Sequence, residues 1–224
     1  MTRLLALDCS AGACSAAVRD GGSLLAWART AMDRGHAEAL LPMLERVMAE
    51  AGIAFADLDA VAATIGPGSF TGVRIGLAAA RGIALAGGLA TVPVTSLDAV
   101  AAAADAGDGP LLVVLDAKRR DLYGQWFGPD GTALGPPRAA PAEALWAERP
   151  AGAGTVRLAG DATAAVRALP LDPGLRVAAA GDLGPDARAV AALALRCLAA
   201  GGGGKLAPLY LRAPDVSMPR GAAS

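Results

Sequence analysis

The sequence predicts a two-lobed α/β fold in which both lobes contain a mixed sheet of the same design. Three observations lead to this prediction. Short apolar runs typical of buried strands alternate with amphipathic, helix-like segments, the opening pattern recurs after residue 110, and turn-forming residues at 105–110 separate the two copies. A length of 224 residues suits two lobes of about 100 residues each.

The first half begins with three strands and continues as an alternating series. Its opening apolar run ends at Asp8, as expected for a buried strand with a polar end. Gly52 is expected to end the first helix, and Ser96 to cap the last one. The predicted strands are 4–7, 14–18, 24–28, 60–65 and 91–94, and the predicted helices are 36–51, 73–86 and 96–104.

The second half repeats the opening, with an apolar run that ends at Asp116. Its predicted strands are 111–115, 122–127, 156–158 and 175–177, and its predicted helices are 142–147, 162–169 and 185–199. We therefore predict a first lobe over 1–104, a smaller second lobe over 105–204 and a C-terminal tail over 205–224, loose at its end. A ligand is expected in the cleft between such lobes.

The composition limits the possible function classes. A net charge of −1 does not favour direct, charge-driven nucleic-acid binding, so any contact with tRNA is expected through a partner. Three cysteines without a zinc-site spacing indicate free thiols and a cytoplasmic location. The longest apolar helix candidate contains Arg74 and Arg81 and is too short to cross a bilayer, so no membrane segment is predicted.

The most distinctive local sequence, Gly66 to Arg74, joins a predicted strand to a predicted helix. Backbone N–H groups at such a place can bind phosphate. The segment does not have the P-loop pattern, and it does not have the dinucleotide pattern, which also argues against a Rossmann-type binding protein. The alternative is a tight strand-to-helix turn in which glycine allows close backbone packing.

The aspartates that end the first strand of each half are the candidate ligand-binding residues. In ATPases of the actin and hexokinase type this position holds magnesium, and the small loop after it holds phosphate. Asp8, Ser10, Gly12 and Asp116 could therefore form a weak or vestigial nucleotide cleft, although the second loop, Lys118-Arg119-Arg120, is too bulky for phosphate. Purely structural aspartates are the alternative. A functional cleft would make the chain an autonomous nucleotide-dependent kinase or hydrolase.

Catalytic machinery of other kinds is not predicted. His36 is the only histidine, which excludes a two-histidine metal site within one chain and favours a surface or partner contact. No serine or threonine has a base at a readable spacing. Gly76, Ala80 and Ala84 form a four-residue series of small residues, which either packs on the chain's own sheet or meets a helix of a partner.

In order and spacing, several segments resemble the TsaB (YeaZ) family over nearly the whole chain, although residues 131–204 match only in outline. The family usually has threonine where this chain has Cys9. The segments are 7–10 with 14–18, 34–43, 66–82, 94–97, 115–119 and 208–212, of which 66–82 is the most specific.

The resemblance implies an actin-like ATPase (ribonuclease H-like) fold and a role as a non-catalytic subunit. Members pair with their paralogue TsaD, joined by TsaE, to transfer a threonylcarbamoyl group to the adenosine beside the tRNA anticodon, and they form homodimers when alone. No cofactor is required, although ATP or ADP is possible at the complex interface. The implied pairing face comprises His36, Leu40, Gly68, Phe70, Arg74, Gly76, Ala80, Arg81 and Ala84.

Overall fold

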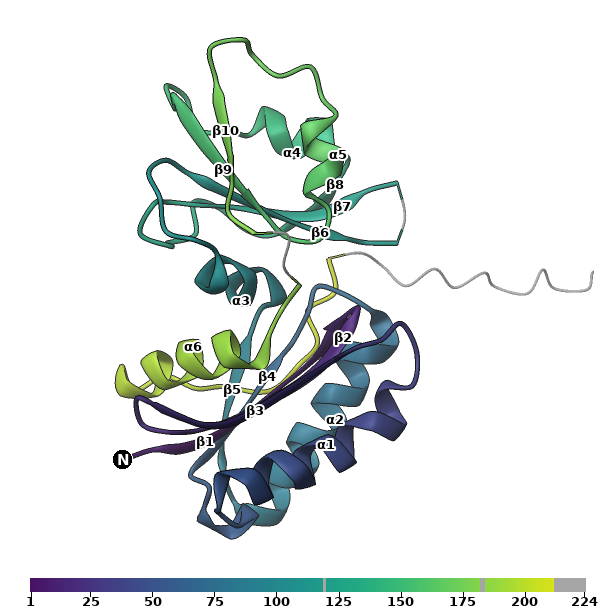
Figure 1. The fold of residues 1–224 in the computed structure, drawn as a ribbon, viewed down its shortest axis with the longest axis vertical. Coiled ribbons are helices and arrows are strands. Elements are labelled where there is room, and N and C mark those ends of the chain that lie inside the picture. Colours follow the sequence, from purple (N-terminus) through teal and green to yellow (C-terminus); the bar gives the residue numbers. More distant parts are fainter. Residues whose placement is uncertain (119, 182–183, 212–224) are drawn as a thin grey trace, which may run out of the picture.

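The computed structural model describes residues 1–118, 120–181 and 184–211. The described chain forms two lobes, each with a five-stranded mixed sheet, and helix α3 (Ser96–Ala103) lies between them (Figure 1). The strand orders are β3-β2-β1-β4-β5 and β10-β9-β6-β7-β8. In both sheets an antiparallel three-stranded part continues into parallel strands, so the second order repeats the first. This repetition confirms the predicted actin-like α/β fold with duplicated mixed sheets.

The first lobe follows the predicted alternation of strands and helices. Its strands are β1 (Arg3–Ala11), β2 (Ala13–Asp20), β3 (Ser23–Ala31), β4 (Ala60–Thr64) and β5 (Ala90–Val94). Its helices are α1 (His36–Ala51), the short 3-10 helix η1 (Phe55–Asp57) and α2 (Phe70–Gly87). Helix α2 begins three residues before the predicted start, because the Ser69 side chain caps it by accepting a hydrogen bond of 3.2 Å from the Gly72 N–H.

The second lobe is smaller and has shorter elements. Its strands are β6 (Leu111–Asp116), β7 (Leu122–Phe127), β8 (Arg138–Ala140), β9 (Thr155–Ala159) and β10 (Arg176–Ala179). Its helices are α4 (Ala142–Ala147) and α5 (Thr163–Arg167), and α6 (Ala187–Ala199) follows them in the chain. Strand β8 was not predicted, because three residues are too few to show an alternating pattern.

Both faces of the first sheet are covered by helices. Strand β1 is buried along nearly its whole length, which is the pattern of a strand covered on both sides. Helices α1 and α2 lie on one face and α6 lies on the other (Figure 1). Ala187, Val190, Ala191 and Ala194 of α6 are fully buried against this sheet.

The packing of α6 corrects the predicted second lobe, 105–204. Helix α6 belongs to the core of the first lobe, because its small apolar side chains cover the sheet face that α1 and α2 leave open. The segment after it also packs on the first lobe. Gly204 N donates to Thr91 O at 2.9 Å, and Leu209 N donates to Ile65 O at 2.7 Å. The predictions for residues 212–224 lie outside the described residues.

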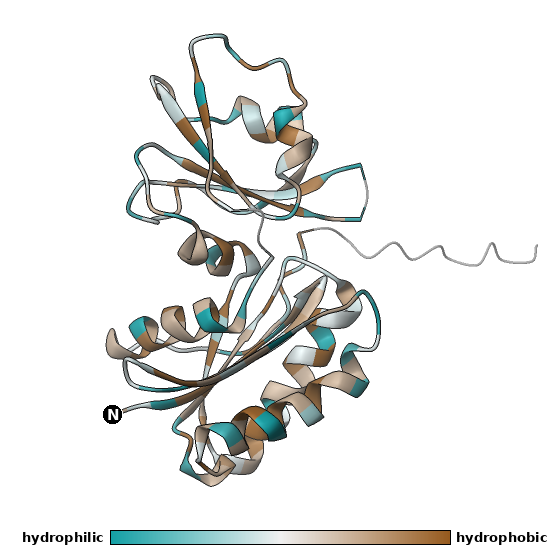
Figure 2. Cartoon of the chain, in the orientation of Figure 1, coloured by the Kyte–Doolittle hydropathy of each residue, from teal (hydrophilic) through white to brown (hydrophobic). Residues whose placement is uncertain are grey.

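Hydrophobic residues are concentrated along the strands of both sheets, whereas helix α1 alternates between polar and apolar positions (Figure 2). In the second lobe, Trp126 is buried beside Trp146, and its indole N–H donates to Leu145 O at 2.9 Å. Of the helices that the structure describes, none combines the length and the apolar character needed to cross a lipid bilayer.

Candidate functional site

Asp8, the first predicted ligand residue, lies inside the protein within β1, three residues before the strand ends at Ala11, and 1% of its surface is exposed. Its Oδ1 atom accepts hydrogen bonds from the Ser10 N–H at 3.1 Å, the Ser10 hydroxyl at 2.6 Å and the Thr64 hydroxyl at 2.6 Å. Its Oδ2 atom has no hydrogen-bond partner among the described residues. The carboxyl group is therefore bound by its own chain instead of facing an open cleft.

The electrostatics of Asp8 follow from this burial. Loss of hydration raises the pKa of the Asp8 carboxyl above its ordinary value, although the hydrogen bonds from Ser10 and Thr64 act in the opposite direction. The nearby carboxylate of Asp186, at the start of α6, adds to the increase in the pKa. An aspartate in this environment holds its proton more strongly than a magnesium-binding carboxylate in water would.

The raised pKa of Asp8 predicts a specific pH dependence of stability. Since the unfolded chain releases this proton near pH 3.8 and the folded chain releases it at higher pH, the free energy of unfolding falls as the pH rises through the folded-state pKa. Asp8→Asn removes this component, at most about 1.4 kcal/mol per pH unit. Urea unfolding of both proteins at a series of pH values from about 4 to 7 checks this prediction. Parallel profiles for the two proteins would contradict it.

Ser10 connects Asp8 to the turn at the start of α2. Its hydroxyl accepts a hydrogen bond of 2.9 Å from the Ser96 hydroxyl, and its carbonyl accepts one of 2.7 Å from the Ser69 N–H. A Cβ atom at Gly68 would lie 2.1 Å from Ser10 O, so only glycine fits there. The Gly66–Arg74 sequence is thus a close-packed turn over Ser10.

Thr95, instead of the predicted Ser96, caps α3, because its side chain accepts a hydrogen bond of 2.9 Å from the Asp98 N–H.

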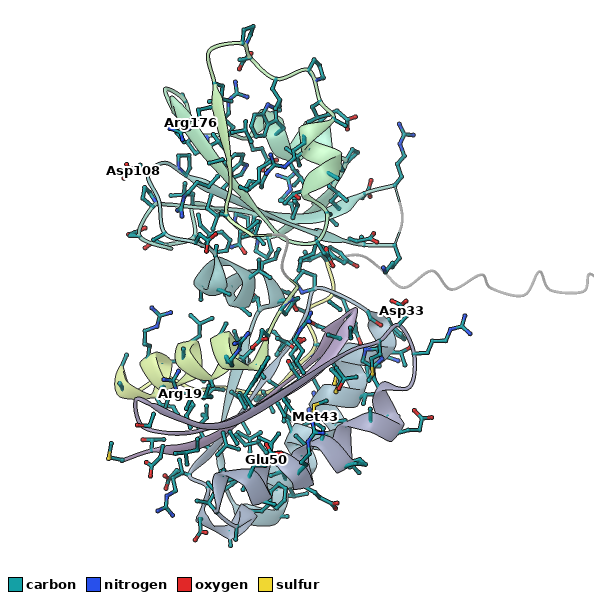
Figure 3. All side chains as sticks on the ribbon, in the orientation of Figure 1. Arg19, Asp33, Met43, Glu50, Asp108 and Arg176 are labelled. Atoms are coloured by element: carbon teal, nitrogen blue, oxygen red, sulfur yellow. The ribbon has the colours of Figure 1, made fainter. Side chains whose placement is uncertain are left out.

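The other two predicted ligand residues, Gly12 and Asp116, are exposed and half-buried, respectively. Gly12 is exposed at the tip of the β1–β2 hairpin. Asp116, at the end of β6, forms an ion pair of 3.1 Å with Lys118, and its N–H donates to Asp161 at 2.8 Å. Hydrogen bonding to Asp116 raises the pKa of Lys118, and Asp33 of the first lobe contributes. Figure 3 shows Asp33 at the edge of the first lobe that faces the second. The ammonium group of Lys118 therefore balances the negative charge of Asp116.

Two cavities of ligand size lie away from these aspartates. One, of about 420 Å³, is lined by residues of the second lobe around Arg149 and Asp172. The other, of about 440 Å³, lies between the lobes, beside α3 and α6, and its lining includes Arg157 and Cys197. Within the described ranges, no group of three His, Cys, Asp or Glu side chains is arranged to hold a metal ion.

The predicted pairing residues separate into a buried and an exposed set. Leu40, Gly76, Ala80 and Ala84 are buried in the first lobe, and a Cβ atom at Gly76 would lie 3.6 Å from the Cys9 side chain. The small-residue series therefore packs on the chain's own sheet and does not form a free surface. His36 is also largely buried, with its Nε2 atom 3.3 Å from Ala11 O.

The exposed set lies along α2, and Phe70 and Arg74 form a compact group at its start. The guanidinium group of Arg74 lies 3.6 Å from the ring centroid of Phe70, and its Nε donates to the Tyr210 hydroxyl at 2.9 Å. Arg81 reaches the C-terminal segment through a hydrogen bond of 2.8 Å to Leu206 O. Phe70 is 48% exposed, so an aromatic ring held by an arginine faces solvent.

Sequence reasoning missed a second series of small residues on α2. Ala78 and Gly82 are exposed, and a Cβ atom added at Gly82 would meet nothing within 4 Å. Leu85, one turn further along the same face, is 87% exposed. The positions of the buried Val73 and Leu77 were the available signal, because they fix which face of the helix points inward.

Comparisons with known proteins agree on one family. A family model described as "TsaD: tRNA N6-adenosine threonylcarbamoyltransferase" matches residues 30–181. The chain is 34% identical over 143 residues to the tRNA threonylcarbamoyladenosine biosynthesis protein TsaB of Escherichia coli, covering 59% of this chain and 62% of that protein. It is 42% identical over 122 residues to TsaB of Haemophilus influenzae, covering 54% of this chain and 51% of that protein. The matches thus span less than two thirds of these relatives.

A solved structure extends the similarity to nearly the whole chain. YeaZ from Pseudomonas aeruginosa superposes with a TM-score of 0.83 at 32% sequence identity, covering 94% of this chain and 100% of that chain. The similarity therefore includes the second lobe, where the sequence alone matched only in outline.

Proposed function

The chain belongs to the TsaB (YeaZ) family, and from this membership we propose that it acts in tRNA threonylcarbamoyladenosine biosynthesis as a non-catalytic subunit. It pairs with a TsaD-type threonylcarbamoyltransferase, with TsaE joining the complex. The complex transfers a threonylcarbamoyl group to the adenosine beside the tRNA anticodon. Contact with tRNA occurs through the complex, and the chain pairs with a second copy of itself when alone.

The geometry around Asp8 is the observation that carries the non-catalytic role. In actin-like ATPases the strand-end aspartates face a magnesium–nucleotide complex. Here Asp8 accepts hydrogen bonds from the hydroxyl groups of Ser10 and Thr64, and Asp116 forms an ion pair with Lys118. A nucleotide would have to break these contacts before it gained any of its own. This cost favours a supporting subunit over the autonomous kinase or hydrolase.

The exposed face of α2 supports the proposed pairing. A helix approaches another helix closely where side chains are small, and Ala78 with Gly82 provides such a place at a spacing of four residues. Arg74 and Phe70 flank it on one side and Leu85 on the other. Aromatic and arginine side chains around a close contact are typical of the residues that dominate interface energies.

Light-scattering chromatography tests the proposal directly. The chain is expected to elute as a dimer alone and as a heterodimer after mixing with the TsaD-type protein of its own organism at micromolar concentration. Once TsaE is added, the heterodimer is expected to show threonylcarbamoyl-transfer activity that neither subunit shows with TsaE alone. A chain that stays monomeric and leaves the activity of its partner unchanged would overturn the proposal.

A further inference from the structure

Two cysteines that the proposed function does not use lie next to each other in the first lobe. The Sγ atoms of Cys9 and Cys14 are 3.3 Å apart, and both thiols are free. In the β1–β2 hairpin Asp8 pairs with Ser15, and Cys9 and Cys14 are the next residues of the two strands, where the pairing register shifts. An Sγ–Sγ distance of 3.3 Å leaves only a small side-chain movement to the S–S bond length of about 2.05 Å that a disulfide requires.

The surroundings hold the two thiols on the same face of the sheet. Both belong to the core cluster under α1 and α2 and are at most 1% exposed. The Cys9 Sγ atom lies 3.9 Å from the place where a Cβ atom of Gly76 would be. The helix therefore restricts the rotation of the Cys9 side chain and keeps its sulfur directed at Cys14.

The shared hydrogen bond makes the two thiols unequal. The hydrogen bond between the two sulfur atoms lowers the pKa of Cys14, and the same bond together with burial raises the pKa of Cys9. The thiolate is the reactive form of cysteine toward oxidants, so Cys14 is the thiol that reacts first.

We propose that Cys9 and Cys14 are a disulfide-forming pair that hydrogen peroxide oxidises reversibly. The Cys14 thiolate attacks one peroxide oxygen, the O–O bond breaks, and Cys14 becomes a sulfenic acid. The other oxygen leaves as hydroxide, which becomes water by taking up the proton that the Cys14 thiol released. The Cys9 sulfur then attacks the Cys14 sulfur, its proton leaves with the departing hydroxide as a second water, and the S–S bond forms. Two thiols and one peroxide thus yield one disulfide and two water molecules.

Access to the pair is provided by the end of the hairpin. Gly12 at the hairpin tip is exposed and Ala11 is half-buried, so the end of the hairpin lies in contact with solvent. Opening of this tip admits peroxide without unfolding the sheet. Cys197 of α6 lies on the other face of the sheet and is half-buried, and it serves as an internal reference.

The test counts free thiols in the full-length chain. The reduced protein is treated with hydrogen peroxide over a range of concentrations, quenched with catalase, unfolded and labelled with N-ethylmaleimide, and its intact mass and peptide masses are measured. The wild type is expected to lose two of its three labels, with Cys9 and Cys14 recovered as one linked peptide, and a phosphine reductant is expected to restore all three.

Single cysteine-to-serine variants show whether the loss of labels comes from the Cys9–Cys14 pair or from Cys197. Cys197→Ser is expected to form the same linked peptide, whereas Cys9→Ser and Cys14→Ser are expected to form none. The treatment is repeated in mild urea, which opens the hairpin more often. Retention of both labels under these conditions, or conversion of the two thiols to sulfinic acids without a link, would overturn the inference.

The disulfide has one consequence that rests on the proposed function. Gly72 and Gly76 of α2 pack directly on Cys9, so rotation of Cys9 into a disulfide shifts the helix that carries the proposed pairing face. The oxidised chain is then expected to bind its partner more weakly than the reduced chain. Labelling is measured without the partner, so failure of the pairing proposal and failure of the disulfide proposal give different results.

Discussion

Replacing Ala78 with tryptophan is expected to abolish pairing of this chain with its TsaD-type partner while leaving the chain folded. Ala78 is exposed on α2, one turn before Gly82, where an added Cβ atom meets nothing within 4 Å. The large ring therefore enters solvent in the isolated chain but occupies the space of the partner helix in the complex. Overpacking of this kind costs about 3 kcal/mol, which corresponds to roughly a hundredfold increase in Kd.

Ala144→Trp is the matched control, because Ala144 is an exposed helical alanine on α4 of the second lobe. Light-scattering chromatography with the partner and circular dichroism of each chain separate pairing from folding. Both variants are expected to give the wild-type spectrum, and only Ala78→Trp is expected to elute as a monomer. If Ala78→Trp paired as tightly as Ala144→Trp, the exposed face of α2 would not be the pairing surface.

Much of the fold could be predicted because local signals and packing agree. Helix α1 begins and ends at the predicted residues, since the left-handed backbone of Gly35 and Gly52 marks both ends. The apolar runs that end at Asp8 and Asp116 became the central strands β1 and β6. The repeat of this pattern predicted the second sheet before its weaker elements could be assigned.

The association of α6 with the first lobe could not be predicted from its position in the chain. The helix follows the second lobe directly, and its pattern of small apolar residues shows that one face is buried but not in which lobe. The continuous burial of β1 was the relevant clue, because a strand buried on both faces needs a helix on each side.

The candidate site was predicted in part. The sequence indicated that Asp8 and Ser10 belong together, and the structure joins them by a hydrogen bond of 2.6 Å. It did not indicate that Thr64 and Ser96 complete the group, because such contacts depend on how distant segments meet. Helix α2 carries two series of small residues, and the sequence led to the series with Gly76 as the candidate pairing face. The large apolar residues beside it, Val73 and Leu77, are buried and show that this series faces the core.

The closest backbone contact in this site predicts the largest loss of stability. In Gly72→Ala the new Cβ atom would lie 2.0 Å from Cys9 O, a backbone carbonyl of the central strand β1. Neither the strand nor the helix can move away without disturbing the turn over Ser10. We therefore expect the substitution to lower the free energy of unfolding by about 3–5 kcal/mol.

The same helix provides the control. Gly82→Ala places its Cβ atom in open space, and alanine is the better helix former, so this variant is expected to be more stable by about 0.5–1 kcal/mol. Both effects are measured by urea unfolding with a common denaturant slope. The opposite signs separate steric overlap from helix propensity, because propensity alone would stabilise both variants. If Gly72→Ala were also more stable, α2 would not press on Cys9, and the close packing that fixes both the buried aspartate and the outward face of the helix would be wrong.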